Sequence, residues 1–176
     1  VAGVIASSGK KSSTVTNALG SLTNADFRGM APAAKLFVLP ADILTGPLIS
    51  DAYLQEEAAH TNAFISNNSW GYHGNTEYDS SAASFDAAVR DALPMQSGPQ
   101  PMLFVFAAGN SGFGNADGTG GEPGTIDSPG TAKNVITVGA LDQLRNITNE
   151  VVMTDATGNS VTNQPFLAET DSDDQV

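Results

Sequence analysis

Apolar positions in this chain fall in short continuous runs, and these runs predict buried strands. The clearest run is Leu103–Ala108, six apolar residues that lead directly into Gly109 and Asn110. A continuous run is typical of a strand in a parallel sheet that is covered on both faces. Strands are also predicted over residues 34–39, 63–69 and 134–140, and residues 147–153 form one more candidate strand.

Between two of the predicted strands lies a segment whose apolar residues have helical spacing. Residues 82–93 carry apolar side chains at positions i, i+3, i+4 and i+7, which are Phe85, Ala88, Val89 and Ala92. The charged residues of the same segment are expected to face solvent on the opposite side; they are Asp86, Arg90 and Asp91. This pattern predicts an amphipathic helix.

Two further helices and the loops complete the predicted elements. Residues 52–62 form a helix with Ser50 or Asp51 as its N-cap. The small apolar residues 1–8 fit the interior of a buried helix. Loops and turns are predicted for the segments 72–81, 94–101, 112–130 and 155–165. Strands that alternate with helices predict an α/β fold with a mostly parallel sheet and right-handed crossovers.

Composition and charge exclude several kinds of binding site and partner. The 176 residues suffice for one domain, and the absence of cysteine excludes disulfides and thiolate metal sites. Seven basic and nineteen acidic residues give a net charge of −12, which argues against nucleic-acid and anionic-membrane partners. No apolar run approaches the roughly 20 residues of a membrane span. His60 and His73 are interpreted as ordinary surface or boundary residues, and two histidines make a multi-histidine metal site unexpected.

The end of the Leu103–Ala108 strand is a candidate site. Functional groups of open α/β sheets gather at the carboxyl ends of the strands, and Asn110 follows such an end. A carboxamide N–H at that position is a donor suited to a developing oxyanion. Gly109 and Asn110 also fit a simple turn, because both residues tolerate left-handed backbone geometry. Taken alone, this stretch favours the turn.

Five motifs, in the same order, resemble those of the subtilisin-like serine proteases, the subtilase family. Residues 1–6 look like the helix that follows the family's His-Gly-Thr-His motif, and residues 29–36 match its Gly-Val-Ala-Pro-x-Ala-x-Leu entry into a strand. Three later segments match its x-Ser-Leu/Trp-Gly, Ala-Ala-Gly-Asn and Tyr-Pro…Val-Ile-x-Val-Gly-Ala motifs; they are residues 68–71, 106–110 and 128–140.

The resemblance implies a subtilisin-like three-layer α/β/α fold and a single partial catalytic domain over residues 1–176. The matched motifs run from residue 1 to about residue 140. Residues 141–176 form a variable region with an acidic tail. A secreted or extracellular location follows from the resemblance as an expectation.

The resemblance also implies a serine endopeptidase that works through an acyl-enzyme. In subtilases a Ser attacks the peptide carbonyl, a His acts as base and an Asp orients the His. The 176 residues lack the motifs that carry these three residues, so we expect the isolated chain to be inactive. An inactive, subtilase-like peptide-binding module is the alternative. A nucleotide-binding domain ranks last, because no phosphate-binding glycine motif follows a predicted strand.

The resemblance assigns roles to individual residues, with a peptide or protein substrate as the partner. Asn110 binds the oxyanion. Ser69, Trp70 and Gly71 form a strand edge that pairs with the substrate backbone. Small residues line the first specificity pocket, namely Ala107, Ala108 and Gly109. Gly46 lies where the family has a second substrate-pairing strand. Trp70 either floors a neighbouring pocket or packs in the core, and the sequence leaves both readings open.

Two further expectations concern backbone and cofactors. Ser128-Pro129 occupies the position of a cis-proline in the family. No cofactor is certain from the sequence, and calcium is the one candidate. The hint of calcium is the Asn-Ala-Asp-Gly segment at residues 115–118, which lacks the spaced carboxylates of a strong site and is better explained as a glycine-rich turn.

Overall fold

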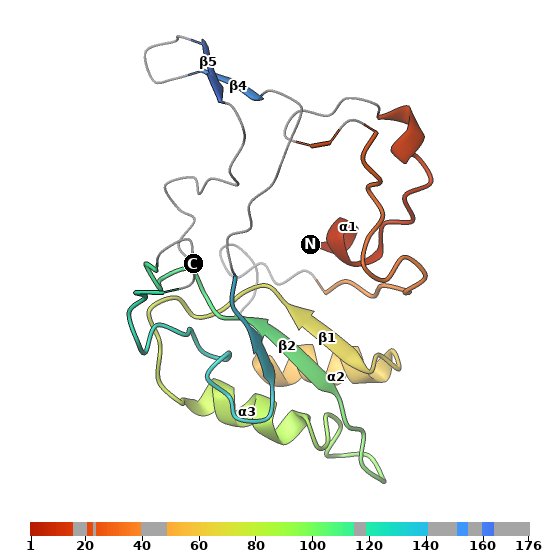
Figure 1. Cartoon of the computed structure of the whole chain (residues 1–176). Coiled ribbons are helices and arrows are strands. Elements are labelled where there is room, and N and C mark those ends of the chain that lie inside the picture. Colours follow the sequence, from red (N-terminus) through yellow and green to blue (C-terminus); the bar gives the residue numbers. More distant parts are fainter. Residues whose placement is uncertain are drawn as a thin grey trace. The chain divides into compact units, whose positions relative to one another are not determined.

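The computed structural model describes residues 1–15, 21–22, 24–39, 49–114 and 119–140, and the backbone of strands β4 (Val151–Thr154) and β5 (Ser160–Asn163). The chain divides into two compact units. Unit 1 comprises Val1–Leu36 and Asp142–Asp174, and unit 2 comprises Phe37–Leu141 with the last two residues. Figure 1 shows the elements of both units.

Unit 2 contains a parallel sheet with helical crossovers. Its strands are β1 (Ile65–Asn68), β2 (Leu103–Ala107) and β3 (Ile136–Val138), hydrogen-bonded in the order β1-β2-β3. Both pairs are parallel, with Asn68 opposite Phe106 and Phe106 opposite Thr137. Helix α2 (Asp51–His60) precedes β1, and helix α3 (Ser80–Ala88) connects β1 to β2. The predicted α/β class and parallel sheet are confirmed.

The core of unit 2 lies between this sheet and its two helices, which pack on the same face of the sheet (Figure 1). Phe104 and Phe106 lie two residues apart on β2, so their side chains point to the same face, and both are 1% exposed. The ring of Phe85 on α3 contacts both at centroid distances of 5.0 and 4.8 Å, edge to face. Edge-to-face pairs contribute about 0.5–1.5 kcal/mol beyond the burial of their area. These aromatic contacts therefore hold α3 against the strand that leads to Asn110.

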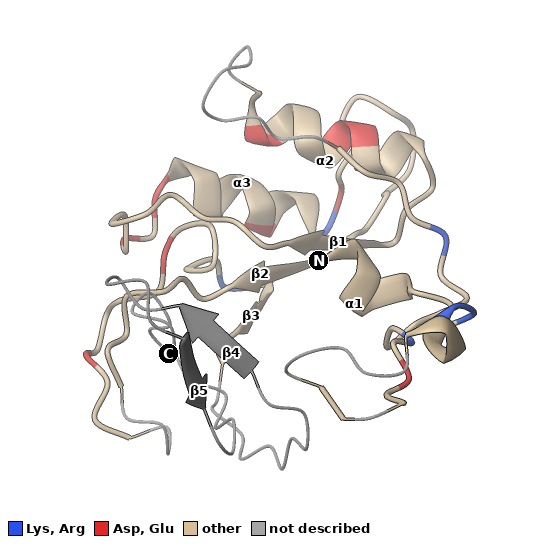
Figure 2. Cartoon of the chain, turned by 90° about the horizontal axis from the view of Figure 1, so that it is seen from above, with Lys and Arg blue, Asp and Glu red and all other residues tan. Residues whose placement is uncertain are grey.

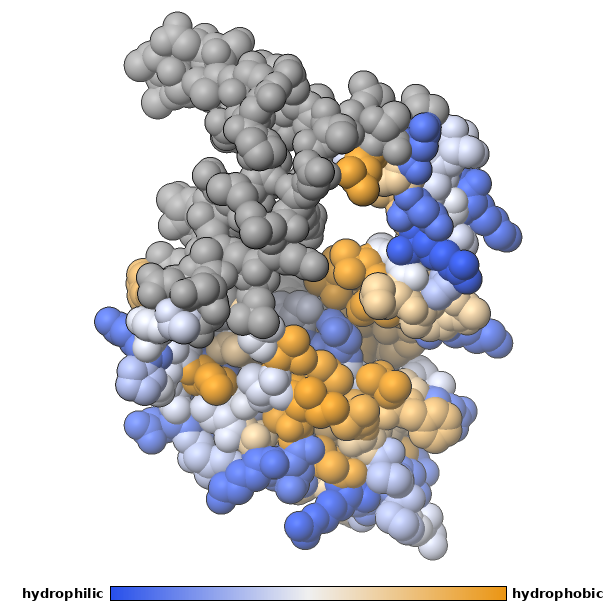
Figure 3. Space-filling view, in the orientation of Figure 1, coloured by the Kyte–Doolittle hydropathy of each residue, from blue (hydrophilic) through white to orange (hydrophobic). Residues whose placement is uncertain are grey.

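The opposite face of the sheet differs from the prediction of strands covered on both faces. Four apolar side chains on this face are exposed, namely Ile65, Leu103, Ile136 and Val138. Figure 3 shows hydrophobic residues gathered over this part of unit 2. The alternation in β2 has a direct physical cause: successive side chains of a strand point to opposite faces, and the described helices of unit 2 cover one of them.

The helices begin at side-chain caps. Ser50, rather than Asp51, caps α2, because its Oγ accepts the N–H of Tyr53 at 3.1 Å. The predicted helix over 82–93 begins earlier, at Ser80, and ends earlier, at Ala88. Beyond this end the backbone donors find other acceptors: the N–H of Ala92 donates to the carbonyl of Gln100 at 2.9 Å, and the N–H of Leu93 donates to Oδ1 of Asp91 at 3.1 Å.

Asp86 does not face solvent as the helical pattern predicts. It is 9% exposed, and its carboxylate accepts the backbone N–H of Asn134 at 2.6 Å and the hydroxyl of Tyr78 at 2.8 Å. Burial alone would raise the pKa of the Asp86 carboxyl, but these hydrogen bonds and the nearby Lys133 outweigh it and hold the pKa below its usual value. The prediction is wrong because segments distant in sequence cover this side of the helix.

Two strand predictions also need correction. Residues 34–39 form no strand, and Leu36, Phe37 and Val38 are exposed, because no described strand pairs with them and an apolar run needs a ladder partner. The segment 155–165, predicted as turns, contains β5, which pairs antiparallel with β4. Strand β4 itself overlaps the candidate strand at 147–153.

Unit 1 contains the predicted N-terminal helix, but that helix is not buried. Helix α1 (Ala2–Ala6) has no buried residue, since no described element of unit 1 covers Val1 or Val4. Its last carbonyls are satisfied by a crossing segment, where the N–H groups of Met30 and Ala31 donate to Val4 and Ile5. A Cβ atom on Gly29 would lie 2.7 Å from this helix backbone, so glycine is required there. The short 3₁₀ helix η1 (Ser12–Thr14) follows.

Candidate functional site

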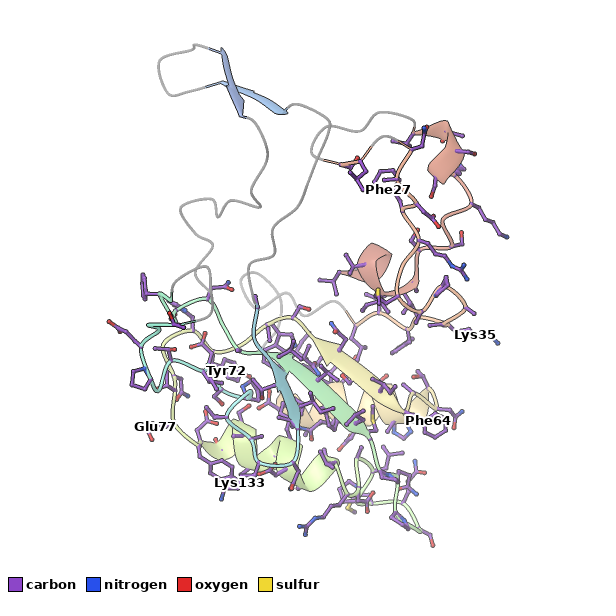
Figure 4. All side chains as sticks on the ribbon, in the orientation of Figure 1. Phe27, Lys35, Phe64, Tyr72, Glu77 and Lys133 are labelled. Carbon is purple, nitrogen blue, oxygen red and sulfur yellow. The ribbon has the colours of Figure 1, made fainter. Side chains whose placement is uncertain are left out.

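The ends of β1 and β2 bring two predicted site segments together. Asn68 and Phe106 are register partners in parallel strands, so Ser69–Gly71 and the residues after Ala107, up to Asn110, leave the sheet at the same edge. Figure 4 places Tyr72 and Phe64 at opposite ends of β1, with Tyr72 at the carboxyl end. The N–H of Ala108 continues the β2–β3 ladder by donating to Val138 at 3.0 Å. Both segments therefore continue directly from hydrogen-bonded strands of the sheet.

A third segment, residues 127–130, ties these two together. The N–H of Asp127 donates to the carbonyl of Ala108 at 3.0 Å, and the carbonyl of Ser128 accepts the N–H of Tyr72 at 2.7 Å. The Ser128-Pro129 peptide bond is cis, as the resemblance implies. Ser128 and Pro129 are fully buried. The β1 and β2 ends are thus hydrogen-bonded to one common backbone segment.

Asp127 is a residue of this region that sequence reasoning missed. It is 5% exposed, and its Oδ1 accepts the N–H of Gly74 at 3.0 Å. Its Oδ2 lies 3.6 Å from Nδ1 of His73, whose side chain is 83% exposed. A Cβ atom on Gly109 would lie 2.7 Å from Oδ2, and one on Gly71 would lie 3.1 Å from the Cβ of Asp127. The available signal was a carboxylate directly before the Ser-Pro pair.

Asp79 anchors the same segment to α3. Its Oδ1 caps the helix by accepting the N–H of Ala82 at 2.9 Å and also accepts the hydroxyl of Ser128 at 2.7 Å, while Oδ2 accepts the amide of Asn75 at 2.7 Å. Burial would raise the pKa of the Asp79 carboxyl, but the hydrogen bonds outweigh it and lower the pKa below its usual value. The carboxylate is therefore held ionised and fixes Ser128.

Tyr72 links the end of β1 to α2. Its hydroxyl donates to Oδ1 of Asp51 at 2.9 Å. Burial and, next, this hydrogen bond to an anion raise the pKa of Tyr72 to about 12. The tyrosine therefore stays neutral throughout the ordinary pH range.

Asn110 is exposed at the carboxyl end of β2. Neither its carboxamide nor its backbone makes a hydrogen bond with another described residue. The same is true of the main chain of Gly71 within the described part of the chain. As far as the described residues go, the site edge therefore offers an unpaired carboxamide and an unpaired peptide group.

The remaining predicted residues have distinct environments. Ser69 is exposed, and its Oγ accepts the amide of Asn67 at 3.0 Å. Trp70 is half-buried and packs edge to face against Phe85 and Phe106, with centroid distances of 6.2 and 5.6 Å. Its indole N–H donates to Asn68 at 3.2 Å. Trp70 thus packs at the edge of the core, while a contact to substrate stays a prediction.

Some predicted features lie outside the described residues, namely Gly46 and the calcium-like segment 115–118. The described residues contain no group of three or more His, Asp or Glu side chains arranged to hold a metal ion. His60 and His73 are both exposed. Among the described helices, none has the length and hydrophobicity required to cross a membrane.

Comparison with known protein families identifies the family to which the chain belongs. The model of the peptidase S8 family, the subtilases, matches residues 1–171. The chain belongs to the subtilase family. The match extends about thirty residues past the last motif recognised in the sequence. Subtilases are serine proteases, so this chain is of the serine endopeptidase kind. No curated protein matches the chain in a sequence comparison.

Proposed function

We propose that Asn110 acts as the oxyanion-hole residue of a subtilase and that the ends of β1 and β2 form part of its substrate cleft. The observation that carries the proposal is the exposed carboxamide of Asn110, which is unpaired within the described residues. A donor that has no partner in the described part of the chain is available to a negatively charged oxygen. Its position after β2, in which Phe104 and Phe106 are both buried, supports the preorganisation that such stabilisation requires.

Substrate binding is proposed at the neighbouring segment Ser69–Gly71. The main chain of Gly71 has no partner among the described residues, so it is available to pair with an extended peptide. The small residues Ala107–Gly109, the last residue of β2 and the two after it, lie beside this segment, and Ala107 is exposed. In this proposal they line the pocket that receives the side chain before the scissile bond.

The nucleophile, the base and the orienting Asp are proposed to lie outside these 176 residues. The isolated segment is then expected to show no turnover of peptide substrates and no labelling by a fluorophosphonate, which reacts with activated serines. Covalent labelling of the isolated 176-residue chain, together with peptide hydrolysis that the label abolishes, would contradict this part of the proposal.

The test of Asn110 uses the full-length endopeptidase that carries this segment. We expect Asn110→Ala to lower kcat by about 100- to 1000-fold with little change in KM, the size of the loss known for the oxyanion-hole Asn of a subtilisin. Asn110→Asp should lower kcat further, because a carboxylate repels the oxyanion. Asn134→Ala removes another exposed carboxamide, distant in sequence from the site, and serves as the matched control. An Asn110→Ala enzyme with a kcat within threefold of the control would refute the role.

A further inference from the structure

We infer that Asp127 is a specificity-determining residue whose carboxylate binds a lysine or arginine side chain immediately before the scissile bond. The inference rests on the proposed function, because it takes Ser69–Gly71 and Ala107–Gly109 as the two walls of the first specificity pocket. It names the class of substrate that this pocket selects, which is a peptide with a basic residue at that position.

Asp127 lies where the two proposed walls meet. A Cβ atom on Gly109, in the second wall, would lie 2.7 Å from Oδ2, and a Cβ atom on Gly71, in the first wall, would lie 3.1 Å from the Cβ of Asp127. Each wall therefore presents a glycine to the same aspartate. A side chain on Gly109 would collide with Oδ2, and one on Gly71 would press tightly against the Cβ of Asp127. The carboxylate thus lies directly against the surface that a substrate side chain would enter.

Among the described residues, one oxygen of this carboxylate has no strong partner. Oδ1 accepts the N–H of Gly74 at 3.0 Å. Within the described residues Oδ2 accepts no hydrogen bond, and the nitrogen paired with it, Nδ1 of His73, lies 3.6 Å away on an 83% exposed side chain. The Asp127 side chain itself is only 6% exposed. A carboxylate this buried is stabilised by a paired cation, which an ammonium or guanidinium group supplies.

The charges of unit 2 favour the same ligand. Residues 37–39, 49–114 and 119–140 contain nine Asp or Glu and two Lys or Arg. Figure 2 shows acidic residues on α2, on α3 and in the loops that follow. One of the two cations, Lys133, lies over the ring of Tyr78, 4.4 Å from its centroid. A negative potential of this kind raises the local concentration of cationic peptides.

The experiment compares two peptide substrates that differ only in the residue before the scissile bond, arginine or phenylalanine. In the full-length endopeptidase we expect kcat/KM to favour the arginine peptide by about 100-fold or more. Asp127→Asn keeps the shape and an acceptor for the Gly74 N–H but removes the charge. It should lower the arginine-to-phenylalanine ratio by about 100-fold while leaving kcat/KM for the phenylalanine peptide within about threefold.

Asp86→Asn is the matched control, since Asp86 is a second buried aspartate whose partners are Asn134 and Tyr78. It should leave the ratio unchanged. A wild-type preference for phenylalanine, or an equal loss on both peptides in Asp127→Asn, would overturn the inference. If Asp127→Asn fails to fold, competitive inhibition of the wild type by benzamidine decides, and its absence counts against the inference. Asn110→Ala slows both peptides alike, so failure of the oxyanion proposal remains distinguishable from failure of this one.

Discussion

Replacement of Gly109 by alanine tests the close approach between the end of β2 and Asp127. Gly109 has a φ of +103°, a conformation that side-chain-bearing residues rarely adopt. The added Cβ would also lie 2.7 Å from Oδ2 of Asp127, and the carboxylate would have to move away from the N–H of Gly74. Backbone strain costs about 1–3 kcal/mol and the loss of a hydrogen bond to a charged group about 1.5–3 kcal/mol.

We therefore expect Gly109→Ala to lower the free energy of unfolding by about 4 kcal/mol, a large part of the roughly 5–15 kcal/mol typical of a domain. Gly124→Ala is the control, because Gly124 also has a positive φ, +75°, but a Cβ there would meet nothing within 4 Å. Gly124→Ala should lower the free energy of unfolding by about 2 kcal/mol, which is the cost of backbone strain alone. The measurement is urea denaturation followed by tryptophan fluorescence.

A double-mutant cycle separates the cost of backbone strain at Gly109 from the cost of the contact with Asp127. In an Asp127→Ala background the contact to Oδ2 is absent, so Gly109→Ala should cost no more than Gly124→Ala does. The reasoning is refuted if Gly109→Ala destabilises the wild-type protein no more than Gly124→Ala, or if its cost is the same in the presence and absence of Asp127.

The remaining predictions concern pH. Because the pKa of Tyr72 is raised to about 12, its contribution to stability is present below pH 10 and should be lost as the pH rises toward 12. In an absorbance titration at 295 nm, Tyr72→Phe should remove a component near pH 12. An unchanged titration curve would contradict the assignment. The pKa of the Asp79 carboxyl is lowered, so its contribution to stability is present above about pH 4, the ordinary Asp value, and should be lost as the pH falls through the lowered value. Asp79→Asn should therefore flatten the dependence of the melting temperature on pH in that acid range. An unaltered slope would contradict this prediction.

The elements that local sequence pattern predicted best are those that carry their own signals. The apolar run of β2, the helical spacing of α3 and the capping residue of α2 all lie within a few residues of the structure they specify. The run at 34–39 has the same composition as a strand, yet it forms none, because a strand also needs a neighbour to pair with. Pattern alone therefore located the sheet that positions Asn110.

The features that sequence missed depend on residues far apart in the chain. Asp86 reads as solvent-facing from its helical position, but Tyr78 and the backbone of Asn134 enclose it. Asp127 reads as one more acidic loop residue, and only its approach to Gly71 and Gly109 distinguishes it. Resemblance to a family identified the motif residues, whereas it gave no indication of a buried carboxylate between them.

The most direct test of the central claim measures how Asn110 acts on the tetrahedral state. In the full-length endopeptidase, a peptide boronate forms a tetrahedral adduct with the serine nucleophile, and the matching product peptide does not. We predict that Asn110→Ala weakens inhibition by the boronate about 100- to 1000-fold and leaves inhibition by the product peptide unchanged, because the carboxamide stabilises only the oxyanion. Equal weakening of both inhibitors, or of neither, would contradict the assignment of Asn110.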